Sequence, residues 1–61
     1  MKRRALLSHL TEQGCELVRE GANHSWWGHR VTKRRSAVPR HAEIHDLLVK
    51  KICKDLGIAA P

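Results

Sequence analysis

The chain has 61 residues, which is room for one small domain, predicted over residues 1–61, and excludes a second core or a cofactor-binding α/β sheet. Its 12 Lys and Arg outnumber its 6 Asp and Glu, and the net charge of +6 with His neutral points to a polyanion as partner. Two cysteines are too few for a secreted disulfide scaffold, and we find neither a signal peptide nor a membrane-spanning run. We therefore expect a cytoplasmic protein with Cys15 and Cys53 reduced and packed inside.

The first predicted element is a helix over residues 2–13. Leu6, Leu7 and Leu10 recur at helical spacing, and Gly14 stands where a left-handed C-terminal cap is wanted.

Three short strands are predicted next, at residues 15–20, 24–27 and 35–38. The turn formers Gly21-Ala22-Asn23 make the first two a hairpin. A basic, irregular stretch over residues 28–34 leads into the third strand, which Pro39 ends because proline has no N–H to donate.

The last predicted element is a helix with Asp46 as its N-cap. Leu48, Ile52 and Leu56 form its apolar stripe. Gly57 ends it, and Ile58 is placed to fold back against the cap.

This order predicts an α+β fold. Two amphipathic helices have one place to bury their stripes, one face of a three-stranded antiparallel sheet, so the other face stays open to solvent. Side chains alternate along a strand, so His24 shares a face with Trp26, while Ser25 shares the opposite face with Trp27. If Trp27 is core, His24 and Trp26 stand together on the open face. The alternative is that both tryptophans fill a small core.

Of five histidines, His24 is the main candidate for chemistry because it opens a strand immediately after a turn. Imidazole as a group exchanges protons near neutral pH. His41 and His45 have H-x-x-x-H spacing, but no C-x-x-C pair accompanies them and Ala42 replaces the glutamate of a zincin motif. The sequence therefore predicts neither a metal nor another cofactor.

The basic residues surround the predicted sheet, which favours RNA or DNA as ligand, although a run of charge is commonly only a solvated face. No helix-turn-helix, zinc-finger or RNP motif is present. The candidate RNA-binding residues are Trp26, Arg19, Lys33, Arg34, Arg35, Lys50, Lys51 and Lys54.

Four segments in this order carry a resemblance to a known family. They are Leu6-Leu7 with Gly14-Cys15, Gly21-Ala22-Asn23-His24-Ser25, Ser36-Ala37-Val38-Pro39-Arg40-His41, and Lys51-Ile52-Cys53-Lys54-Asp55-Leu56-Gly57-Ile58. Over nearly its whole length the chain resembles the HicA toxins of type II toxin-antitoxin systems. It departs from them after the second strand, where Gly28-His29-Arg30-Val31-Thr32 stands in place of the Asn-Pro and later glycine that relatives often carry.

The resemblance implies a fold like the double-stranded RNA-binding domain and an endoribonuclease, an mRNA interferase, that stops translation and is neutralised by a HicB antitoxin. It also implies that His24 is the catalytic residue. The expected reaction is metal-free attack of a ribose 2′-hydroxyl on the adjacent phosphate, with His24 as general base or acid. Arg19, Lys33 and Arg35 are candidates for stabilising the developing charge. The alternatives are a non-catalytic RNA-binding module and a basic structural or ribosome-associated peptide.

Overall fold

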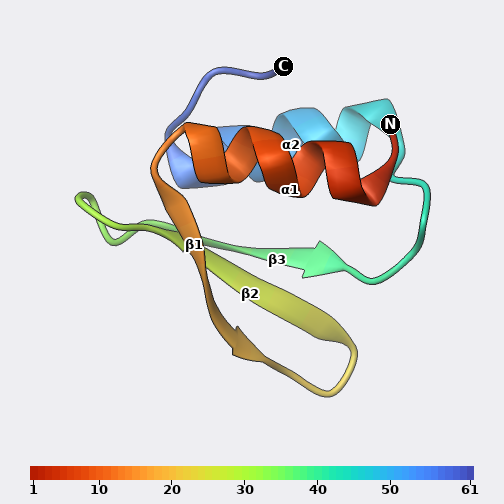
Figure 1. Cartoon of the computed structure of the whole chain (residues 1–61), viewed down its shortest axis with the longest axis horizontal. Coiled ribbons are helices and arrows are strands. Elements are labelled where there is room, and N and C mark those ends of the chain that lie inside the picture. Colours follow the sequence, from red (N-terminus) through yellow and green to blue (C-terminus); the bar gives the residue numbers. More distant parts are fainter.

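The computed structural model describes residues 1–61 and has the predicted order of elements. Helix α1 (Arg3–Glu12) is followed by strands β1 (Cys15–Glu20), β2 (His24–His29) and β3 (Arg35–Pro39) and by helix α2 (Asp46–Leu56). The strands pair antiparallel in the order β1-β2-β3, and both helices lie on one side of the sheet (Figure 1). The α+β prediction is confirmed. Neither helix has the length and apolar character needed to cross a membrane.

One hydrophobic core lies between the helices and the sheet. Its ten buried residues are Leu6, Leu10, Cys15, Trp27, Val38, Ile44, Val49, Ile52, Cys53 and Leu56. Trp27 is 9% exposed while Trp26 is only partly buried, so one tryptophan fills the core and the other does not. Both cysteines are free and buried, and burial raises the pKa of each thiol.

The apolar stripe of α2 differs from the predicted one by one position. Ile52 and Leu56 are buried as predicted, and Val49, which was not predicted, is buried as well, while Leu48 is only half-buried. Val49 lies one turn before Ile52 and Cys53, which point into the same core. Leu48 packs at the edge of this cluster.

The start of α2 also differs. His45 is the N-cap, and its Nδ1 accepts a hydrogen bond from the Leu47 N–H at 3.2 Å, so the assignment of Asp46 was wrong by one residue. Met1 and Ile44 explain the shift, because the Ile44 N–H donates to the Met1 carbonyl oxygen at 2.8 Å and fixes the chain just before the helix. Asp46 becomes the first helical residue, 3.6 Å from the N-terminal ammonium.

Strand β2 runs two residues further than predicted. Gly28 pairs with Glu16 and Arg35, and His29 pairs with Cys15, so long-range pairing outweighs the weak strand preference of glycine. Pro39 belongs to β3 rather than following it, and lies opposite His24. Proline is tolerated there because β3 is an edge strand.

The end of α2 confirms the sequence prediction. Gly57 has φ +72°, its N–H donates to the Lys54 carbonyl oxygen at 3.1 Å, and the Ile58 N–H donates to the Cys53 carbonyl oxygen at 3.0 Å. These two bonds make a Schellman motif, which satisfies the last carbonyls of the helix.

Replacing Gly57 with Ala is expected to destabilise the domain by about 1–2 kcal/mol, because a side chain is strained in the left-handed region. The added Cβ would also lie 3.1 Å from Nη1 of Arg34. Urea unfolding followed by circular dichroism measures the change. Gly57→Asn is the matched variant, because Asn tolerates this conformation, and it should be destabilised less. Equal destabilisation of the two variants would contradict the assignment of the cost to the backbone.

Candidate active site

His24 lies on the open face of the sheet, at the start of the central strand β2. Its neighbour Ser25 and the core residue Trp27 are buried on the helix side, so alternation places His24 and Trp26 on the other side. The imidazole is exposed, whereas the backbone is fixed, because the His24 carbonyl oxygen accepts from the Gly21 N–H at 2.8 Å. His24 and Trp26 therefore lie together on the open face, as predicted.

Trp26 and Arg19 form a flat, cationic surface on this face. A register irregularity between Leu17 and Arg19 brings Arg19 opposite Trp26, and the guanidinium carbon lies 6.0 Å from the centre of the indole ring. This is within the range of a cation–π contact. Gly21 allows the indole to lie against the turn, since a Cβ on Gly21 would be 3.1 Å from Nε1 of Trp26. The surface can stack on an unpaired base.

The Arg40 side chain forms hydrogen bonds to the turn that precedes His24. Its Nη1 donates to the Ala22 carbonyl oxygen at 3.2 Å, and its Nη2 donates to the carbonyl oxygens of Gly21 and, at 3.2 Å, His24. Nη2 also lies 3.0 Å from Oε1 of Glu20. One guanidinium thus binds both ends of the turn and the backbone of His24 itself.

Glu20 connects Arg40 to the helix side of the sheet. Its Oε1 accepts from the Ser25 hydroxyl at 2.6 Å, Ser25 Oγ accepts from Nη2 of Arg3 at 2.9 Å, and Nε of Arg3 donates to the Pro39 carbonyl oxygen at 2.8 Å. The hydrogen bond from Ser25, followed by that from Arg40, lowers the pKa of Glu20. The Glu20 carboxylate stays ionised at neutral pH, so the network joins one negative charge to the positive charges of Arg3 and Arg40.

We call the four side chains of this network, Arg3, Glu20, Ser25 and Arg40, the turn clamp. None of them is among the site residues predicted from the sequence. They come from α1, from β1, from β2 and from the segment after β3, and no local motif connects them.

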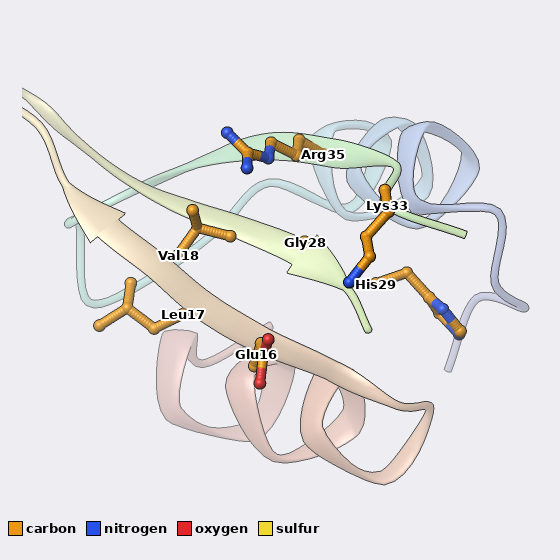
Figure 2. Close-up of a pocket in the computed structure, with 7 residues that line it drawn as sticks. All are labelled: Glu16, Leu17, Val18, Gly28, His29, Lys33 and Arg35. Atoms are coloured by element: carbon orange, nitrogen blue, oxygen red, sulfur yellow. The ribbon is translucent and has the colours of Figure 1, made fainter. Parts of the chain in front are cut away.

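The other predicted RNA-binding residues fall into three groups. Lys33 and Arg35 line a hollow at the far end of the open face, beside Gly28 (Figure 2). Arg34 instead donates to the carbonyl oxygens of Asp55 at 2.9 Å and Lys54 at 2.8 Å, so its guanidinium is engaged at the end of α2.

The lysines of α2 are on the helix layer, away from His24. Lys50 and Lys54 are exposed on α2. Lys51 makes an ion pair with Asp55 at 2.7 Å, and this contact is the main cause of the lowered pKa of Asp55. The structure does not bring these three lysines together with the open face.

Three of the remaining four histidines make hydrogen-bond contacts within the fold. His45 caps α2, His9 lies 2.7 Å from the Ala59 carbonyl oxygen, and His29 Nδ1 accepts from the N–H groups of Val31 and Thr32. His41 is exposed. No three His, Cys, Asp or Glu side chains are grouped so that they could hold a metal ion.

Comparison with known proteins gives a family match. A family model described as the HicA toxin of bacterial toxin-antitoxin systems matches residues 3–58 of the chain. No curated protein and no solved structure matches it significantly.

Proposed function

Because the chain belongs to the HicA toxin family of bacterial toxin-antitoxin systems, we propose that it is an endoribonuclease that cleaves messenger RNA and so inhibits translation. The observation that carries this proposal is the exposed imidazole of His24 beside the Trp26–Arg19 surface. A proton-transfer group next to a stacking surface and a cation suits the binding and cleavage of RNA. The α-β-β-β-α order with an open sheet face also supports the likeness to double-stranded RNA-binding domains.

The proposed reaction is an internal transfer of the phosphoryl group. The ribose 2′-oxygen forms a bond to the adjacent phosphorus, its proton passes to a base, and the bond from phosphorus to the 5′-oxygen breaks as that oxygen takes up a proton. His24 supplies one of these two proton transfers, either as base or as acid. Arg19 is the nearest candidate to offset the charge that develops on the phosphate, since it shares the open face with His24. The products carry a 2′,3′-cyclic phosphate and a 5′-hydroxyl.

The purified protein is expected to cleave single-stranded RNA in excess chelator, because the attacking nucleophile is the 2′-hydroxyl of the RNA and the proposed reaction assigns no step to a metal ion. A matched oligonucleotide with a single 2′-deoxyribose at the cleaved linkage should resist, since it lacks the attacking hydroxyl. Gel electrophoresis measures the fragments, and their end groups identify the reaction. RNA that is bound but stays intact would contradict the proposal and indicate a non-catalytic RNA-binding module.

Membership of this family implies an antitoxin partner, and we propose that it is a HicB-like protein in the cytoplasm. A surface with net charge +6 favours an acidic inhibitor, and one that covers His24 would exclude RNA. Added to the same assay, a cognate partner of this kind should stop cleavage. A complex that still degrades RNA would contradict this placement.

A further inference from the structure

The open face carries a second feature, a hollow of about 220 Å³ centred on Gly28. Val18 of β1 and Arg35 of β3 lie on its two sides, and the Lys33 side chain runs back toward the Gly28 end of β2 (Figure 2). Glycine in a central strand is unfavourable unless something must approach closely. Here the position of a Cβ is only 3.0 Å from Cγ2 of Val18 and 3.4 Å from Cγ of Arg35, so any side chain at Gly28 would fill the floor of the hollow.

The charge in this hollow favours an anion. Neither Lys33 nor Arg35 has an ion pair, whereas Lys2, Arg40 and Lys51 each bind a carboxylate. The acidic residue at the rim is Glu16, and its Oε1 lies 3.9 Å from Nε of Arg30, so its charge is partly offset.

The loop holds Lys33 in a conformation that costs energy. Lys33 has φ +67°, a region that a lysine adopts at a cost of about 1–2 kcal/mol. Its N–H donates to the His29 carbonyl oxygen at 3.0 Å, and the His29 N–H donates to the Arg34 carbonyl oxygen at 2.8 Å. In this closed loop the Lys33 side chain is directed toward the end of β2 (Figure 2).

We infer that this hollow is a phosphate subsite, in which Lys33 and Arg35 bind the RNA backbone away from the linkage that His24 cleaves. The inference rests on the proposed function. Gly28 follows His24 by four residues on β2, about 13 Å along an extended strand, so the two sites contact different parts of one RNA. The hollow is smaller than the ~300–1,000 Å³ pockets that enclose small molecules, and therefore suits a group presented by a polymer.

The first test measures binding of a labelled single-stranded oligoribonucleotide in the His24→Ala background, so that the RNA stays intact. Lys33→Asn retains the left-handed backbone and removes the charge, and Arg35→Gln removes the second charge. Each is expected to bind about tenfold more weakly, the factor for one charge-assisted hydrogen bond. The slope of log affinity against log salt should fall by about 0.7 for each phosphate that is no longer neutralised. The matched control is Arg4→Gln, which removes one exposed charge from α1 and should leave the slope unchanged.

The second test measures steady-state cleavage with His24 present. A subsite remote from the reacting phosphate predicts a higher KM with little change in kcat. A lower kcat at unchanged KM would overturn the subsite and place the two cations at the cleaved phosphate. A decrease in affinity equal to that of Arg4→Gln would overturn it as well. If the wild type binds RNA without cleaving it and Lys33→Asn still weakens binding, the proposed nuclease activity fails and the subsite stands.

Discussion

Replacement of His24 by alanine is expected to lower RNA cleavage by about 10²–10⁴-fold, the contribution of one positioned proton-transfer group, with little effect on folding. The imidazole is exposed on the open face, so its removal leaves no cavity. The backbone bond from the Gly21 N–H to the His24 carbonyl oxygen does not depend on the side chain. Single-turnover cleavage measures the decrease in rate, and thermal unfolding followed by circular dichroism checks the fold.

His9→Ala is the matched control for this experiment. His9 lies on α1, with its Nε2 2.7 Å from the Ala59 carbonyl oxygen, and takes no part in the proposed site. The His9→Ala protein should cleave at the wild-type rate. A His24→Ala protein that cleaves as fast as the wild type would show that another group, or a contaminating nuclease, carries out the reaction.

Replacement of Arg40 by lysine is expected to lower kcat by about 10–100-fold, because small displacements of a catalytic group cost this much. We regard Arg40 as a positioning residue. Its guanidinium contacts the carbonyl oxygens of Gly21, Ala22 and His24 and the Glu20 carboxylate, which an ammonium group cannot bridge together. Arg40→Ala should lower kcat at least as much. Cleavage at saturating RNA measures kcat, and hydrogen exchange of the Gly21 amide reports loosening of the turn.

The comparison of arginine with lysine separates position from charge. If Arg40 acted only through its charge, Arg40→Lys would retain wild-type kcat, and that result would contradict the positioning role. Arg30→Lys is the matched control, since Arg30 is exposed and its nearest carboxylate is 3.9 Å away. It should change neither kcat nor the exchange of the Gly21 amide.

Local chemistry explains which parts of the fold the sequence predicts well. Gly57 and Ile58 end α2 as expected because a Schellman motif is formed by adjacent residues. The side-chain alternation that assigns Trp27 to the core and His24 to the open face is equally local. Contacts between distant segments explain the errors. The pairing of Met1 with Ile44 shifts the cap of α2 to His45, and the partners of Gly28 on both sides extend β2.

In the candidate site as well, residues that depend on local sequence were predictable and residues that depend on distant contacts were not. His24 is predictable from its place after a turn and from the family resemblance, and Trp26 follows from alternation. The turn clamp was not predictable, because Arg40 reaches Glu20 across 20 positions of the chain and Arg3 reaches Ser25 across 22. Composition also cannot separate a cation that is free to bind a ligand from one already used. Arg34 and Arg35 are neighbours in sequence, yet one binds α2 and the other lines the hollow.

The bonds from Arg34 to the carbonyl oxygens of Lys54 and Asp55 fasten the loop between β2 and β3 to the last turn of α2. Lys33 directly precedes Arg34 in this loop, so the hydrogen bonds of Arg34 connect the segment that carries Lys33 to the helix layer. Displacement of the Arg34 guanidinium from these carbonyl oxygens would therefore free the loop between β2 and β3 from the helix layer.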